Sequence, residues 1–409
     1  MISGKTPEGI AYAVRRSGSS AAYCALSIGC GTRDEMGFPP GIAHFTEHAI
    51  FKGTQKRRSW QINSCLERLG GELNAFTTKE EIVIHATVLK EDLRKALNLL
   101  TELALEPRFP EDEIEIEKGV VIDEIQSYKD SPADDIYDCF ESLLFEGHPL
   151  EGQILGTEDS VRSINVEQLH KFASDGFLPE RMAVSMVADL PEERMSRLIC
   201  DISAKTFGSR LFGTFSPRTL LAPRGLRFER REEKGNHEAN AIIGGYAPSL
   251  SERKPRLAAG LLANMLAGPA SNSILGSILR EKNGWVYGVE ASYTPYSDTG
   301  VMAISLGCEG DNLGKCLRAV RKEIRKMQEG PIPQRRLAVA KKQLIGQMAV
   351  SSANGESQCL GMGKSLLAFG EIISDEQVRS NIMDISADDL LNAARTIFDP
   401  EKTSTLIFV

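Results

Sequence analysis

The stretch Gly41-Ile42-Ala43-His44-Phe45-Thr46-Glu47-His48-Ala49-Ile50-Phe51-Lys52 contains the most informative pattern in the chain. Its apolar periodicity predicts a helix that carries the motif His-x-x-Glu-His. Residues four apart lie on one face of a helix, so His44 and His48 can share one zinc ion. Glu47, three residues after His44, lies on the same face, where it can act as general base toward a water molecule that the metal activates.

The third metal ligand has to come from another part of the chain. A catalytic zinc ion takes three protein ligands and leaves one position open. The acidic segment 110–129 has the pattern of a helix, on which Glu117 and Glu124 are seven residues apart and lie on one face. Helix geometry alone does not choose between these two glutamates.

Composition limits the class of protein and its partners. The 409 residues, 42% of them hydrophobic and 25% charged, suffice for two or more globular domains. A formal net charge of −8 argues against nucleic acid as a partner. Neither a signal peptide nor a membrane-spanning run is visible, which predicts a cytoplasmic protein without a membrane partner. The eight cysteines form no Cys-x-x-Cys pair, so we expect reduced thiols.

The order of predicted elements occurs twice along the chain. Residues 1–205 show strand and helix patterns whose order recurs in residues 226–409, and the Gly- and Pro-containing segment 206–225 is predicted to be a linker. The fold class is therefore α+β, with two homologous domains, each a mainly antiparallel sheet packed against helices. Only the first domain carries His-x-x-Glu-His, so the second is expected not to bind zinc on its equivalent helix.

With these residues the chain resembles the pitrilysin/insulinase family of zinc metallopeptidases, the inverzincins, and especially its short processing-peptidase branch. The resemblance covers the whole chain. In that family the third ligand follows the second histidine by 76 residues, and 124 − 48 = 76, which implies one Zn²⁺ per chain on His44, His48 and Glu124. Glu117 matches the family's accessory glutamate, which supports the site without binding zinc directly.

Two further segments match the family. Gly70-Gly71-Glu72-Leu73-Asn74-Ala75-Phe76-Thr77 is similar to its edge strand, which binds the substrate as an added β-strand; this implies that Asn74, Ala75 and Phe76 bind substrate. The segment 279–288 is similar to the family's arginine and tyrosine segment. The resemblance implies that Arg280 and Tyr287 bind the substrate backbone and stabilise the tetrahedral intermediate. Taken alone, the two would be a surface salt-bridge partner and a half-buried strand residue.

The function implied by the resemblance is that of a zinc-dependent endopeptidase whose peptide substrates are enclosed in a chamber. One chain would supply half of a clamshell, so a homodimer or a heterodimer with a related subunit is expected. The main alternative is a non-catalytic core or assembly subunit of a larger complex, and a second is a zinc hydrolase of small molecules. The presence of all four motif residues, His44, Glu47, His48 and Glu124, argues against the non-catalytic alternative.

Overall fold

The computed structural model describes residues 1–409 except Ser209, Leu211 and Asn236. Its contacts divide the chain into two compact units, each built from three segments. The first unit comprises residues 1–126, 152–218 and 350–373. The second unit comprises residues 127–151, 219–349 and 374–409.

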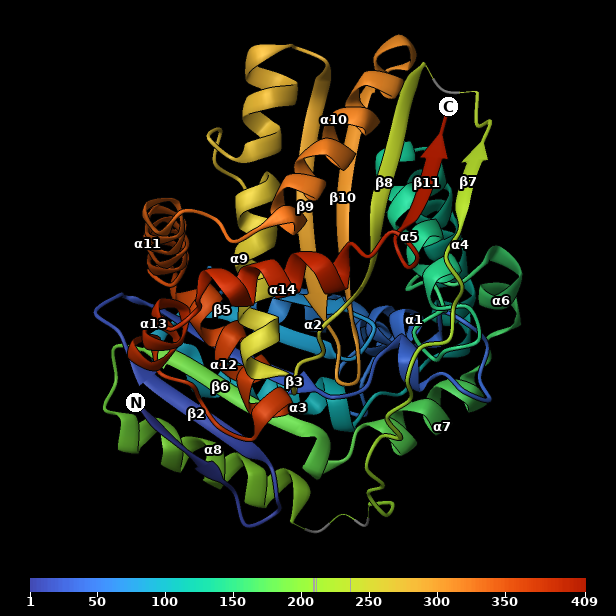
Figure 1. Ribbon diagram of the computed structural model, residues 1–409. Helices are drawn as coiled ribbons and strands as arrows, with labels where there is room; N and C mark the ends of the chain where they lie inside the picture. Colours follow the sequence, from blue (N-terminus) through green and yellow to red (C-terminus); the bar gives the residue numbers. More distant parts are fainter. Residues whose placement is uncertain (209, 211, 236) are drawn as a thin grey trace. The chain divides into compact units, whose positions relative to one another are not determined.

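The first unit is built on a six-stranded sheet in the order β1-β2-β6-β3-β5-β4 (Figure 1). Its strands are β1 (Ile2–Lys5), β2 (Ala11–Arg16), β3 (Ala21–Ile28), β4 (Glu72–Thr77), β5 (Ile82–Leu89) and β6 (Met182–Ala188). Strands β2 and β6 pair in parallel, and the other neighbours in this sheet are antiparallel. Strand β4 pairs with β5 alone and therefore forms one edge of the sheet.

Both faces of this sheet are apolar because helices cover both. The helices are α1 (Ile42–Ala49), α2 (Ser59–Glu67), α3 (Leu93–Leu105), α4 (Glu111–Lys129), α6 (Glu158–Ser163), α7 (Val166–Gly176), α8 (Glu192–Phe207) and α12 (Gly355–Phe369). Alternate side chains of a strand point to opposite faces. Thus Cys24 and Leu26 of β3 join the main core with α1, α3 and α8, whereas Ala25 joins a second cluster with Cys359 and Met362 of α12.

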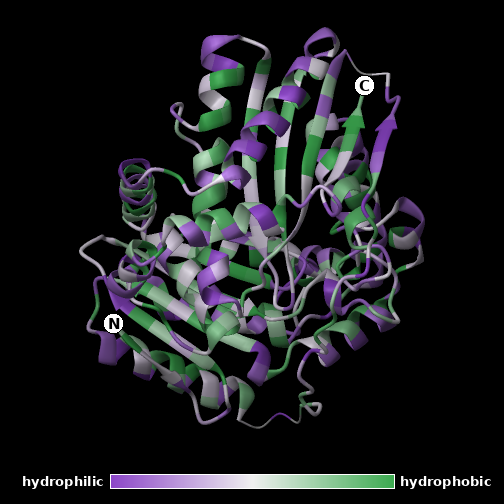
Figure 2. Ribbon diagram, in the orientation of Figure 1, coloured by the Kyte–Doolittle hydropathy of each residue, from purple (hydrophilic) through white to green (hydrophobic). Residues whose placement is uncertain are grey.

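The second unit contains a five-stranded sheet in the order β7-β11-β8-β10-β9. Its strands are β7 (Glu229–Glu232), β8 (Glu238–Ala247), β9 (Val286–Pro295), β10 (Gly300–Glu309) and β11 (Ser404–Phe408). Its helices are α5 (Pro132–Leu144), α9 (Arg253–Ala267), α10 (Gly310–Glu329), α11 (Gln334–Ser351), α13 (Asp375–Met383) and α14 (Ala387–Ile397). The inner strands β8 and β10 are largely hydrophobic, whereas the edge strand β7 is charged (Figure 2). Charged side chains on an edge strand oppose unwanted pairing with other strands.

The two sheets share one topology, which confirms the predicted repeat. Strands β7 and β11 pair in parallel like β2 and β6, and the remaining pairs of the second sheet are antiparallel. Each sheet is therefore mixed, with one parallel pair in an otherwise antiparallel arrangement. Strand β1, which the sequence patterns did not indicate, is an additional edge strand of the first sheet.

The contact units differ from the predicted contiguous segments 1–205 and 226–409 by an exchange of two helices. Helix α5 comes from the first half of the chain and packs against β8 and β11 in the second unit. Helix α12 comes from the second half and packs against β3 and β6 in the first unit. In each unit the exchanged helix covers the sheet face that the unit's other helices leave open. Within the predicted linker 206–225, the units divide after Arg218; Ser209 and Leu211 lie outside the described residues.

Two further details bear on the predictions. The segment Gly276–Lys282, which carries Arg280, is a π-helix, and π-helical turns are rare. Within the described part of the chain, no helix combines the length and the hydrophobicity that a membrane span requires.

Candidate metal centre

Helix α1 places the motif histidines on one side of a largely buried helix. Ile42, Phe45 and Ala49 are fully buried and anchor α1 in the main core of the first unit. His44 and His48 lie one turn apart on the same face, with their ring centroids 4.6 Å apart. The apolar side of the helix therefore fixes the direction in which both imidazoles point.

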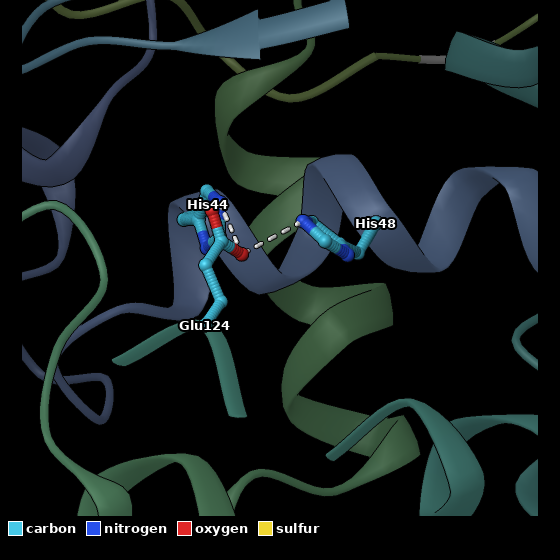
Figure 3. Close-up of side chains that lie close together, drawn as sticks. All are labelled: His44, His48 and Glu124. Atoms are coloured by element: carbon cyan, nitrogen blue, oxygen red, sulfur yellow. Dashed lines mark ion pairs between the residues drawn. The ribbon is translucent and has the colours of Figure 1, made fainter. Parts of the chain in front are cut away.

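Glu124 on α4 faces both histidines (Figure 3). Its Oε2 lies 3.7 Å from Nε2 of His44 and 3.6 Å from Nε2 of His48. One ligand atom from each of the three residues lies within 4.8 Å of those of the other two. Of the two glutamates that helix geometry left open, Glu124 is thus the one in this cluster.

The geometry and chemistry of the cluster fit a zinc ion. Separations of 3.6 and 3.7 Å are too long for hydrogen bonds, so the three groups converge without bonding to one another. Tetrahedral zinc with bonds of about 2.0–2.1 Å separates its ligands by about 3.3 Å, close to these values. Two imidazoles and one carboxylate are also a ligand set of catalytic zinc sites. Burial, with a smaller effect of His48, lowers the pKa of His44 to about 3, which keeps its imidazole neutral.

Glu117 lies behind His48 and orients it. Its Oε1 is 2.8 Å from Nδ1 of His48, and its Oε2 is 2.5 Å from Nζ of Lys52. Burial alone would raise the pKa of Glu117, but the bonds from His48 and Lys52 lower it overall. An ionised Glu117 can accept a hydrogen bond from Nδ1–H of His48. In the neutral imidazole, that tautomer leaves the lone pair on Nε2, the nitrogen that faces Glu124.

Glu47 is held by the edge strand. Its Oε2 accepts a hydrogen bond of 2.6 Å from Oγ1 of Thr77, the last residue of β4. Burial raises the pKa of Glu47, partly opposed by the bond from Thr77 and the charge of His48. A carboxylate with a raised pKa is a better proton acceptor, as a general base requires.

The protein-family models match most of the chain. The model described as "Insulinase (Peptidase family M16)" matches residues 12–158, and the one described as "Peptidase M16 inactive domain" matches residues 163–344. An "Uncharacterized zinc protease" of Rickettsia bellii is 30% identical over 92% of this chain and 90% of its own length. The chain belongs to peptidase family M16.

A further relative and a solved structure are similar to this chain. The "Uncharacterized zinc protease ML0855" of Mycobacterium leprae is 29% identical over 90% of this chain and 83% of its own length. The crystal structure of a protease from Helicobacter pylori has the same fold, with a TM-score of 0.88 at 20% identity over 100% of this chain and 98% of that one. The matches to the two family models confirm the recognition of the family from its motifs.

The remaining predicted site residues of this M16 chain lie in both units. Asn74, Ala75 and Phe76 lie on the edge strand β4, as expected. Arg280 lies in the π-helix and Tyr287 on β9, both exposed and both in the second unit. The substrate-binding roles of these five residues stay predictions.

Sequence reasoning did not single out Thr77, which hydrogen-bonds Glu47, or Lys52, which pairs with Glu117. Thr77 ends the predicted edge strand and Lys52 ends the stretch quoted first. The alternation of β4 offered a signal for Thr77. Leu73 and Ala75 pack against the core that contains α1, so the next side chain on that face is Thr77.

Proposed function

We propose that this chain is a zinc-dependent endopeptidase in which His44, His48 and Glu124 hold the metal and Glu47 is the general base. The observation that carries the proposal is the convergence of these three ligand atoms on one face of α1, next to a glutamate held by the edge strand. Zinc-protease names among the M16 relatives support the same assignment.

The metal ligands, Glu47 and Glu117 would each have a distinct role in peptide hydrolysis. A zinc ion held there would polarise the peptide carbonyl and lower the pKa of water at its open position. Because Thr77 occupies Oε2 of Glu47, Oε1 is the oxygen left to take a proton from the attacking water and pass it to the leaving nitrogen. Glu117 holds His48 in the tautomer that a ligand needs.

The substrate would bind as an extended strand beside β4. The outer edge of β4 has no neighbouring strand within the described sheet, so its backbone groups can pair with a peptide. Thr77 ends this strand and contacts Glu47, which would bring the bound backbone close to the general base. This mode of binding favours unfolded or extended peptides over small molecules.

Replacing Thr77 with valine is expected to lower kcat by about 10- to 100-fold, because a hydrogen bond to a charged group contributes about 1.5–3 kcal/mol. Valine keeps the shape and the β-propensity of threonine but cannot donate to Glu47. Thr77→Ser, which retains the hydroxyl, should stay within a few-fold of wild type. Steady-state kinetics on a quenched fluorescent peptide measure both. Equal kcat values for Thr77→Val and wild type would exclude this role of the hydroxyl.

Replacing Glu117 with alanine is expected to weaken zinc binding by about 10- to 100-fold, the usual effect of losing a partner of a metal-bound histidine. Competition against a chromogenic zinc chelator measures the affinity. Glu115→Ala is the matched control, because Glu115 lies on the same helix and pairs with Lys118. If both variants bind zinc as wild type does, Glu117 does not support the site.

The proposed activity is tested with a library of quenched peptides and the purified chain, before and after removal of metal. Cleavage should disappear on chelation and return with zinc. A zinc-loaded chain that cleaves no peptide, either alone or with a related subunit, would favour the non-catalytic alternative. The expected dimer, implied by family resemblance, is tested separately by analytical ultracentrifugation.

A further inference from the structure

The N-terminus of helix α1 is capped by a residue outside the helix. Its N-cap, Gly41, has no side chain and adopts a left-handed conformation with φ of 86°. The side chain of Glu35 takes over the cap: Oε2 accepts a 2.9 Å hydrogen bond from N of Gly41, and Oε1 accepts one of 2.9 Å from N of Ala43. Both oxygens of one carboxylate therefore satisfy backbone groups at the start of the helix that carries His44, Glu47 and His48.

This carboxylate is enclosed by the first unit. Glu35 is 8% exposed, and nearby Lys79 is 3% exposed. Burial raises the pKa of Glu35, whereas the bonds from Ala43 and Gly41 and the charge of Lys79 lower it. Because both oxygens accept from N–H groups, the ionised carboxylate is the form that makes both cap bonds. Burying a glutamate costs free energy unless its oxygens accept hydrogen bonds. The two cap bonds therefore stabilise Glu35 in its buried position.

Segment 31–35, which carries Glu35, is also hydrogen-bonded to the turn that follows strand β4. N of Thr32 donates to O of Thr78 at 3.3 Å, and N of Arg33 donates to O of Lys79 at 2.9 Å. Gly31 lies so close to this turn that a Cβ atom there would be 2.5 Å from O of Thr78. The tight approach requires glycine, and it fixes segment 31–35 against the residue that follows Thr77.

These contacts link α1, strand β4 and segment 31–35 to one another. Glu35 binds the start of α1, Glu47 of α1 is hydrogen-bonded to Thr77 of β4, and the turn after β4 is hydrogen-bonded to segment 31–35. The bond between Glu47 and Thr77 joins α1 and β4 directly, and segment 31–35 joins them a second time. The position of the helix relative to the edge strand is thus set at two points.

We propose that Glu35 is a positioning residue that fixes α1, with its metal-binding histidines and general base, against the substrate-binding edge strand. The catalytic significance of this inference rests on the proposed peptidase function, whereas the positioning itself does not. Glutamine at position 35 can accept only one of the two backbone hydrogen bonds, because its amide nitrogen is a donor. Loss of one cap bond should let the start of α1 open more often.

The test compares Glu35→Gln with wild type by hydrogen–deuterium exchange in the metal-free chain and by steady-state kinetics in the zinc-loaded chain. We expect peptides covering residues 41–49 and 77–80 to exchange about 3- to 10-fold faster, with α3 unchanged. We expect kcat to fall about 10-fold with KM unchanged, because a small misplacement of reacting groups slows catalysis. Glu35→Asp, too short to reach both amides, is a second variant in case Glu35→Gln does not fold.

A matched control is Glu323→Gln, which alters a buried glutamate of the second unit that pairs with Lys326. It should change neither the exchange of residues 41–49 nor kcat. If the folded Glu35 variants exchange like wild type over residues 41–49, or lose protection evenly across the first unit, the positioning role is wrong. If wild type cleaves no peptide, the proposed function fails, and the exchange data still decide the role of Glu35.

Discussion

Glu47→Gln is expected to lower kcat by about 10³- to 10⁴-fold while zinc content stays at one ion per chain, since a general base contributes up to about 10⁴-fold. Glutamine preserves the size of the side chain and can still accept the hydrogen bond from Thr77. It cannot take a proton from water. The measurement is kcat on a quenched peptide together with metal analysis of the same sample.

The contrast between activity and metal content makes this variant informative. Glu47 contributes no atom to the group formed by His44, His48 and Glu124, so its replacement should leave zinc affinity nearly unchanged. Normal turnover by Glu47→Gln would remove the general-base assignment. Loss of both zinc and activity would instead place Glu47 among the ligands.

His48→Ala is expected to lose both zinc and peptidase activity, because it removes one of three protein ligands and leaves Glu117 without its histidine partner. Lys52 still pairs with Glu117, so the variant should fold. Zinc content after gel filtration should drop below about 0.1 ion per chain at micromolar zinc if affinity falls by the several orders of magnitude expected for a lost ligand.

The matched control is His237→Ala, which removes an exposed histidine of the second unit. Its zinc content and kcat should equal those of wild type, and circular dichroism should show that both variants are folded. A His48→Ala variant that retains stoichiometric zinc would show that the metal binds elsewhere.

Much of the fold was predictable because local patterns dictate it. Strand β4 lies within the predicted segment 70–77, whose alternation and glycines are local signals, whereas its position at the sheet edge followed from the family resemblance. The exchange of α5 and α12 was not predicted. No local signal in either helix says which of two apolar sheet faces it covers.

The candidate site was also predictable only in part from local sequence patterns. The spacing of His44 and His48 on one helix follows from helix geometry, whereas the choice of Glu124 over Glu117 depended on family resemblance. In the structure the two glutamates differ in what they face: Glu117 faces Nδ1 of His48, and Glu124 faces Nε2. That difference depends on how α4 packs against α1. The contact of Glu35 with the helix start likewise depends on a loop whose path the sequence alone does not reveal.

The central claim is that one zinc ion binds His44, His48 and Glu124, and anomalous diffraction at the zinc absorption edge tests it most directly. Crystals of the chain purified with zinc should show one peak per chain, about 2.0–2.2 Å from Nε2 of His44, Nε2 of His48 and a carboxylate oxygen of Glu124. Crystals grown with excess zinc that show no peak at these residues, or a peak only elsewhere, would contradict the claim.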